Sequence, residues 1–216
     1  GVWCFDVMAT EFGTADGAER TGGDVDMSIP HPLQNSWTLY FNTSVGGKGG
    51  KSSWDENLKT VTEISTVESL WGTLNAIAEP TALMPSSTYY LFKTGIKPLW
   101  EDKGNENGGK FTIKLRDKSL VNEIWLNSVL LVLGDCFASD DSDEICGLEM
   151  AVRSQQTRLS MWIATSDNFA LRDNIKAKWR REICVGGLPS DMDIEFDPHM
   201  NQQSYQKPYG GYRGGR

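Results

Sequence analysis

The apolar side chains of this chain switch repeatedly between two spacings, one typical of strands and one typical of helices. Residues 36–41 alternate apolar and polar positions, as in a strand with one buried face. Residues 67–77 carry apolar side chains at helical spacing, and Pro80 would end a helix there. Over 216 residues, this alternation predicts one domain in which helices pack on a sheet.

The same patterns predict the remaining elements. Further strands are expected over residues 57–64, 89–92, 110–116, 147–153 and 158–165, and further helices over residues 119–133 and from residue 167 to 186. Several strands are joined by hairpin-length loops, which favours antiparallel pairing. We therefore predict an α+β fold, with a curved, mostly antiparallel β-sheet backed on its convex face by three helices. The other face of the sheet would be free to curve around a ligand.

Capping residues mark the expected helix ends. Ser65 and Glu68 have the spacing of a capping box, in which each side chain binds the main chain of the other residue. Gly134 follows the second helix as its expected C-terminal cap, and Asp167 is placed to cap the third helix at its start.

Both ends of the chain differ in composition from the middle. Residues 1–28 are acidic and weakly patterned, which predicts a mobile arm in front of a binding domain at residues 29–197. Residues 198–216 are rich in Gln, Tyr, Gly and Arg, which predicts a disordered tail. The tail is either simply solvated or contacts RNA through its arginine and tyrosine side chains.

Composition argues against several classes of protein. No apolar run approaches the roughly 20 residues that span a bilayer, and the first residues lack a signal-peptide pattern. We expect no membrane contact and a cytoplasmic protein, with the nucleus as a second location. The net charge of −8 argues against a surface that coats nucleic acid, but a compact anion site needs only a few cations.

Neither metal nor catalytic motifs are found. The four cysteines form no C-x-x-C pair and there are only two histidines, so we expect no metal, no cofactor and reduced thiols. A disulfide between Cys136 and Cys146 is the alternative. No nucleophile–base pattern and no phosphate-binding glycine loop occur, which indicates a protein that is not an enzyme.

The eight tryptophans fall into two groups. Trp37 lies on an alternating strand, and Trp125 and Trp179 lie on apolar helix faces, so we expect these three in the core. Trp54 and Trp100 lie in loops among polar neighbours. Either one alone could fold back onto the surface, but two loop tryptophans in one small domain suggest a clamp that stacks on a flat ring.

Glu101 directly follows Trp100 and suggests which ring is bound. A guanine presents N1–H and its 2-amino group side by side, and one carboxylate accepts both. Methylation at N7 makes the base positive, which adds a cation–π attraction of about 1–2 kcal/mol to the stacking. The alternative for Glu101 is an ordinary exposed carboxylate.

Cations for a phosphate chain are expected beside the turn at residues 154–157. If the apolar residues of the two flanking strands face the helices, Arg153, Arg158 and Trp162 share the opposite face. Two arginines there could hold a di- or triphosphate through forked hydrogen bonds. The alternative is a pair of solvated arginines at strand ends.

Several blocks of sequence, in order, resemble the eukaryotic translation initiation factor 4E family, the mRNA cap-binding proteins. The resemblance covers about residues 29–187, and its most specific blocks are HPLQNSW at 31–37, TVESLW at 66–71 and LFKTGIKPLWED at 91–102. The fold that it implies is the curved sheet with three helices expected above.

The resemblance also implies roles for individual residues at a 7-methylguanosine cap. Base contacts are implied for Trp54, Trp100, Glu101 and Trp162, with Trp162 near the N7-methyl group, and phosphate contacts for Arg153, Arg158, Lys110 and Gln155. The family usually has arginine at position 110 and lysine at position 155. Loss of one cation should weaken cap binding by about 1 kcal/mol at a solvated site.

A second surface is implied on the convex side, where the family binds a short helix of a 4G-type scaffold factor or of a 4E-binding protein. The matching residues are His31, Pro32, Val67, Trp71, Leu126, Leu130 and Gly134. For Val67, Leu126 and Leu130, packing between helix and sheet is the alternative. Asn127 replaces a usually acidic residue, which could alter the choice of partner.

Three functional hypotheses remain open. The first is an initiation factor that binds capped mRNA and a scaffold protein and is otherwise monomeric; a tryptophan at position 54, where the repressor branch usually has tyrosine, favours it. The second is a cap-binding translational repressor that recruits no initiation scaffold. The third is an interaction module of ribonucleoprotein particles with a weak cap pocket.

Overall fold

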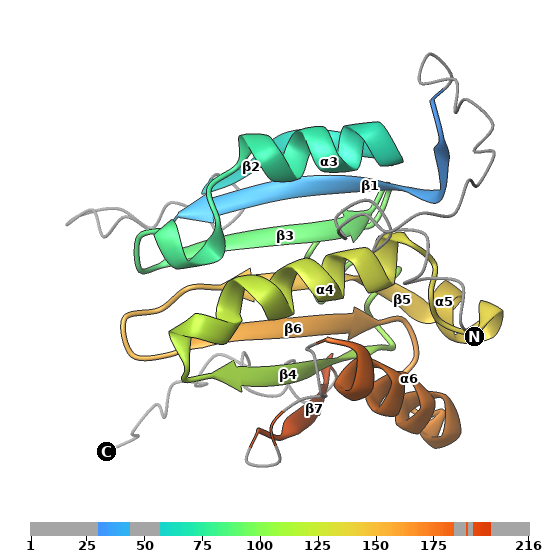
Figure 1. Cartoon of the computed structure of the whole chain (residues 1–216). Coiled ribbons are helices and arrows are strands. Elements are labelled where there is room, and N and C mark those ends of the chain that lie inside the picture. The colour runs from blue at the N-terminus through green and yellow to red at the C-terminus, as the bar shows by residue number, and fades with distance from the viewer. Residues whose placement is uncertain (1–29, 44–56, 184–188, 190–191, 200–216) are drawn as a thin grey trace, which may run out of the picture.

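The computed structural model of the chain describes residues 30–43, 57–183, 189 and 192–199. Within them, a sheet has the strand order β2–β1–β3–β5–β6–β4–β7, and every neighbouring pair is antiparallel (Figure 1). The bounds of the strands are β1 Pro32–Thr43, β2 Leu58–Thr66, β3 Ser87–Lys93, β4 Gly109–Leu115, β5 Ile145–Ala151, β6 Thr157–Ile163 and β7 Ile194–Pro198.

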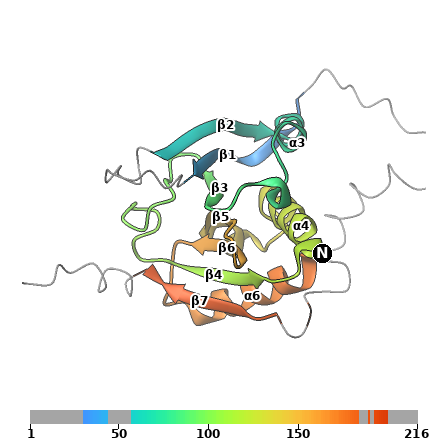
Figure 2. The ribbon, with the colours of Figure 1, turned by 90° about the vertical axis from the view of Figure 1, so that its left-hand side faces the viewer.

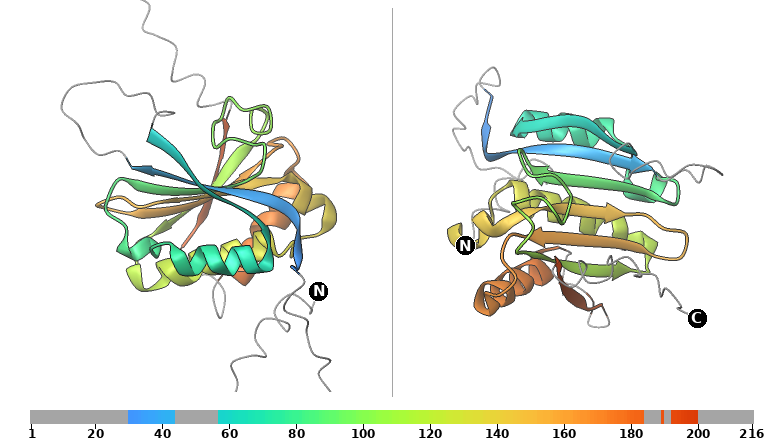
Figure 3. Two further views of the ribbon diagram at one scale, coloured as in Figure 1. Left: turned by 90° about the horizontal axis from the view of Figure 1, so that it is seen from above. Right: turned by 180° about the vertical axis from the view of Figure 1, so that it is seen from behind.

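Helices cover one face of this sheet and leave the other to loops (Figure 2). They are α3 Val67–Ala76, α4 Val121–Leu133 and α6 Phe169–Glu182. A short helix α5, Ser139–Glu144, and the 3-10 turns Pro80–Ala82 and Lys118–Leu120 lie in the connections. Seen from above, the strands fan out with the twist of a curved sheet, and the helices lie on its convex side (Figure 3). The predicted fold class is confirmed.

The main core lies between the helices and the sheet. Trp37 of β1, Trp125 of α4 and Trp179 of α6 are 2%, 4% and 0% exposed, which confirms the predicted core tryptophans. The Trp179 indole N–H donates to Ser128 Oγ at 2.9 Å, so its polar atom is satisfied inside the core. A second buried cluster occupies the concave face and contains Tyr90, Phe92, Cys146 and Trp162.

Two of the predicted caps are shifted by one residue. Thr66 and Ser69, rather than Ser65 and Glu68, form the capping box of α3. The Glu68 carboxylate is used elsewhere, since it accepts hydrogen bonds from His31. Asn168 rather than Asp167 caps α6, with its Oδ1 accepting from the Leu171 N–H at 3.1 Å.

Other boundaries also differ from the predictions. Gly134 does cap α4, and its N–H donates to the Leu130 carbonyl, but the residue with left-handed backbone is the next one, Asp135 (φ 53°). The predicted stop at residues 186–187 lies outside the described residues, and so do the predicted arm at residues 1–28 and residues 200–216 of the predicted tail. Pro198 and His199, at the start of that tail, belong to the packed fold.

The cysteines differ from the expected set of reduced thiols. Cys146 is free and buried, so it forms no disulfide with Cys136. Cys136 is itself disulfide-bonded. Burial raises the pKa of the Cys146 thiol to about 12, which leaves it protonated and unreactive at neutral pH.

Candidate functional site

Two polar side chains cross-link the loop between β3 and β4. The Asp102 carboxylate accepts from two main-chain N–H groups of this loop at 3.1 and 2.9 Å. The fully buried Asn105 amide donates to two of its carbonyls, both at 2.8 Å. The loop crosses the side of the sheet away from the helices (Figures 2 and 3). Trp100 and Glu101 are therefore held in place above the concave face by bonds within their own loop.

Trp100 is half-buried and packs against the concave-face cluster, whereas Glu101 is exposed. Part of the indole is anchored by that cluster, and the remainder stays accessible to a flat ring. Glu101 is the next residue after Trp100, and its exposed carboxylate can accept hydrogen bonds from two neighbouring donors of a base. Trp54, the predicted second half of the clamp, lies outside the described residues.

Trp162 forms the floor beneath this loop and shares one carboxylate with Lys110. Its indole N–H donates to Glu149 Oε2 at 3.0 Å, and Lys110 Nζ donates to the same oxygen at 3.2 Å. The ammonium also lies 5.2 Å from the centre of the Trp162 ring. Because Trp162 is only 5% exposed, its ring plane is set by Glu149 and its neighbours. Sequence reasoning missed Glu149, although its position in the strand alternation puts it on this face.

His199 packs against the same floor. The centre of its ring lies 4.5 Å from that of Trp162, and its Nδ1 is 2.9 Å from the Asn105 carbonyl oxygen. The main-chain N–H of His199 donates to the Gly108 carbonyl. A carbonyl can only accept, so Nδ1 carries the proton. Nε2 is buried and has no partner in the described part of the chain. Sequence reasoning assigned His199 to the tail, because one histidine carries no periodic signal and β7 was not predicted.

Burial lowers the pKa of His199 from its ordinary value of 6.5, so the folded protein binds this proton less readily than the unfolded chain. We expect the free energy of unfolding to fall as pH drops through 6.5 towards the folded pKa, with a slope of up to about 1.4 kcal/mol per pH unit for one proton. Urea unfolding between pH 7.5 and 5 measures this slope.

Histidine variants assign that slope to one residue. His199→Gln should remove it, whereas His31→Gln, which changes the other, exposed histidine, should retain it. An unchanged slope in the His199 variant would contradict the assignment.

The three predicted residues around the β5–β6 turn have different surroundings. The Arg153 guanidinium donates to the Ser87 carbonyl at 3.0 Å and to Thr88 Oγ1 at 3.2 Å, so it is tied to the start of β3. Arg158 and Gln155 are exposed. Arg158 lies on β6 directly opposite Lys114 of β4, four residues from Trp162 and on the same side of the sheet.

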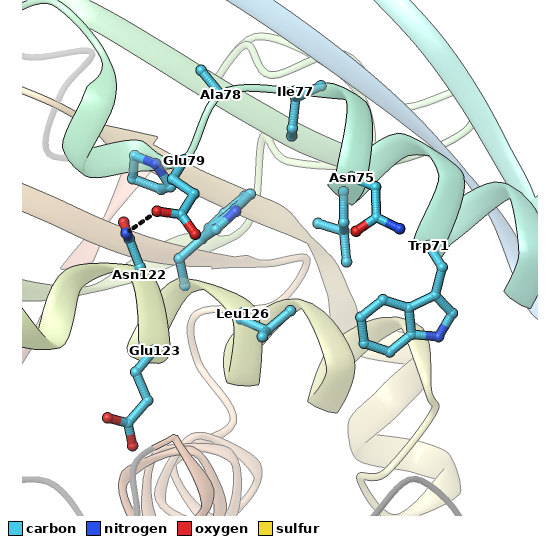
Figure 4. A pocket seen from close by; sticks show the side chains of 11 residues that line it. Trp71, Asn75, Ile77, Ala78, Glu79, Asn122, Glu123 and Leu126 are labelled. Carbon is cyan, nitrogen blue, oxygen red and sulfur yellow. Dashed lines mark hydrogen bonds between the residues drawn. The ribbon is translucent and has the colours of Figure 1, made fainter. Parts of the chain in front are cut away.

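The convex side carries a separate apolar surface. A hollow of about 260 Å³ between α3 and α4 is lined by Trp71, Leu74 and Leu126, which are half-buried, and by Trp125, which is buried (Figure 4). Its far end is closed by the hydrogen bond from Asn122 Nδ2 to Glu79 Oε2 at 2.6 Å.

The other predicted residues of this side lie along the same two helices. Val67, Leu126 and Leu130 are only half-buried, so they are not fully enclosed in the helix-to-sheet core, and Gly134 is exposed at the end of α4. Pro32 is the first residue of β1 and His31 directly precedes it. The His31 ring lies 2.6 Å from the Glu68 carboxylate, which lowers the pKa of Glu68 to about 2. This pair ties the segment before β1 to the first turn of α3.

The described residues hold neither a cluster of metal-binding side chains nor a helix that could cross a membrane. No group of three or more His, Cys, Asp or Glu side chains among them could hold a metal ion. None of their helices combines the length and the apolar character that crossing a membrane requires.

The fold and this site define a class: a curved antiparallel sheet backed by helices, with an aromatic and charged concave face. The model of the family described as eukaryotic initiation factor 4E matches residues 32–210. The chain belongs to the eukaryotic initiation factor 4E family. It is 36% identical to eukaryotic translation initiation factor isoform 4E-2 of Triticum aestivum over 166 residues, which are 77% of this chain and 78% of that protein.

Other relatives and solved structures agree. Eukaryotic translation initiation factor 4E of Bos taurus is 34% identical over 176 residues, 80% of this chain and 77% of that protein. The complex of C. elegans eIF4E-3 with the 4E-binding protein Mextli and cap analog matches with a TM-score of 0.73 and 29% identity, over 82% of this chain and 96% of that one. A schistosome eIF4E complexed with m7GpppA and 4E-BP matches with a TM-score of 0.72 and 29% identity, over 85% and 95%.

Proposed function

We propose that this protein binds the 7-methylguanosine cap of mRNA on its concave face and a helical segment of a scaffold protein on its convex face. The observation that carries the proposal is the cross-linked loop that holds Trp100 and Glu101 above the Trp162 floor. It supplies one stacking surface and a carboxylate for guanine. Family membership and the cap analogs bound by its solved relatives support the same ligand.

The proposed roles at the cap follow from these positions. Trp100, together with Trp54, would sandwich the methylated base, and Glu101 would accept its N1 and N2 protons. Arg158 and Lys110 would face the phosphates, with Arg153 held at the edge by β3. Gln155 adds no charge, so we expect weaker phosphate binding than a lysine there would give. No step of this proposal is catalytic.

A titration with 7-methyl-GTP, with GTP as the control, tests the proposal. We expect saturable quenching of tryptophan fluorescence by the methylated nucleotide and about 5- to 30-fold weaker binding of GTP, since the cation–π attraction is worth about 1–2 kcal/mol. Equal affinity for both nucleotides in a folded protein would reject the cap pocket and favour the interaction module.

A scaffold peptide separates the initiation factor from the repressor. A helical peptide of the 4G type should bind across α3 and α4, and Trp71→Ala should weaken it at least about tenfold, as expected for an aromatic residue at the centre of a helix-binding surface. Isothermal titration calorimetry measures this. Cap binding without any binding of the 4G-type peptide would support the repressor, for which the 4E-binding proteins are the partner type.

The same proposal covers location and assembly. We infer a cytoplasmic monomer that associates with capped mRNA and its protein partner. Residues 1–28 would form an arm outside the binding domain. The tail would begin after His199 rather than at residue 198, because His199 is buried.

A further inference from the structure

A strip of cations continues along the concave face past the proposed phosphate site. Lys114 lies directly opposite Arg158 in the β4–β6 ladder, so the two side chains share one face of the sheet. Lys110, which is four residues earlier on β4, faces the Trp162 floor from the same side. Following β4 from the floor therefore leads from Lys110 to Lys114, a distance of about 13 Å.

Arg116 extends this strip beyond the end of β4. Lys114 and Arg116 line one hollow of about 180 Å³, together with Met192, Asp193 and Glu195. Both cations are exposed, and 43% of the Lys114 side chain is open to solvent. Lys110, Lys114 and Arg116 thus place three cations within a short segment of a chain whose net charge is −8. Sequence patterns alone assigned no role to Lys114 or Arg116.

Acidic neighbours moderate the charge of the strip. Lys114 Nζ is paired with the Glu195 carboxylate of β7, and Asp193 lies 3.8 Å from Lys176 Nζ. Since both members of the Lys114–Glu195 pair are about half exposed, the pair is weak and can be replaced by another anion. The strip therefore carries at least two cations, Arg116 and Arg158, that no carboxylate pairs within the described residues, and a third that a phosphate can recruit.

We propose that Lys114 and Arg116 bind phosphates of the nucleotides that follow the cap, so that this protein grips the first part of the RNA as well as the cap itself. The inference rests on the proposed function, because the strip starts at Arg158, where the cap phosphates are proposed to bind. An RNA strand suits it better than an acidic peptide does, since the strip is continuous with a polyphosphate site.

The experiment compares 7-methyl-GTP with a capped RNA of about six nucleotides, over a range of salt concentrations. The unaltered protein should bind the capped RNA more tightly than 7-methyl-GTP. The double variant Lys114→Gln with Arg116→Gln should lose about 3- to 10-fold in affinity for capped RNA at about 0.1 M salt and keep its affinity for 7-methyl-GTP. Its slope of log K against log salt should fall by about 1.4, or about 0.7 per lost phosphate contact.

Two further variants sharpen the test. Glu195→Gln frees Lys114 and should strengthen binding of capped RNA without affecting 7-methyl-GTP. Lys59→Gln is the matched control, because Lys59 is an exposed lysine of the edge strand β2 at the other end of the sheet, and it should change neither ligand. Thermal melting checks that all variants are folded.

The outcomes are distinct. An equal salt slope and affinity for capped RNA in the double variant and the unaltered protein would overturn the inference, and so would an equal loss for both ligands. Binding of an acidic peptide that depends on Lys114 and Arg116, with capped RNA unaffected, would assign the strip to a protein partner and also overturn it. Failure of the unaltered protein to bind 7-methyl-GTP would instead overturn the proposed function, and the inference with it.

Discussion

Trp100→Ala is expected to lower affinity for 7-methyl-GTP by about 2–3.5 kcal/mol, roughly 30- to 300-fold, because it removes both base stacking and the cation–π attraction. The loop itself should persist, since Asp102 and Asn105 tie its main chain without the indole. Fluorescence or calorimetric titration gives the affinity. GTP should lose less than 7-methyl-GTP, because an uncharged base gains no cation–π term.

Glu101→Gln provides the complementary variant. The amide keeps one acceptor but turns an N–H₂ group towards a base edge that offers only donors, so affinity should fall about 10- to 100-fold. Phe169→Ala is the matched control, because Phe169 is a 71% exposed aromatic residue on α6, on the helix-covered side. Full affinity in Trp100→Ala would place the methylated base elsewhere on the protein.

The second large effect concerns stability. Trp179→Ala should lower the free energy of unfolding by about 3–5 kcal/mol, because it empties a site that is 0% exposed at the centre of the main core. It also leaves Ser128 Oγ without the indole donor that lies 2.9 Å away. For a domain of this size the melting temperature should fall by about 10 °C.

A second substitution at this position separates packing from hydrogen bonding. Trp179→Phe retains most of the ring and should cost about 1–3 kcal/mol, less than alanine. Urea denaturation measures both values, provided that the slope of the free energy of unfolding against urea concentration is unchanged. A cost below about 1 kcal/mol for alanine would mean that the helices α4 and α6 repack around the gap.

Much of the fold could be predicted because the amphipathic elements carry clear periods. The alternation of Trp37 and Leu39 predicts a strand, and both residues are buried in it. By contrast, β7 is short and has only a few apolar positions, Ile194 and Phe196, in acidic surroundings, and α5 is a run of six polar residues without an apolar face. Patterns of this length do not distinguish a strand or helix from a loop.

The candidate site was predicted less completely, because its supporting contacts link distant segments. Trp100 and Glu101 were found from their loop position. Glu149 was overlooked, since a carboxylate on a strand reads as a solvated position until a partner such as the Trp162 N–H is known. The N-cap of helix α3 is Thr66 rather than the predicted Ser65 because of another contact between distant segments. His31, which is 37 residues away in the chain, binds the Glu68 carboxylate that the predicted capping box would have used.

During synthesis of the chain, His199 is added 94 residues after Asn105, the residue whose carbonyl it binds. Until residues 194–198 are made, β4 lacks its β7 neighbour and presents unpaired backbone groups at the edge of the sheet. Trp100 and Trp162 are already present in such an unfinished chain, but one of the contacts that set their positions is not. A polypeptide released just before this residue would thus contain every proposed base-contacting side chain and still lack the histidine that packs against Trp162.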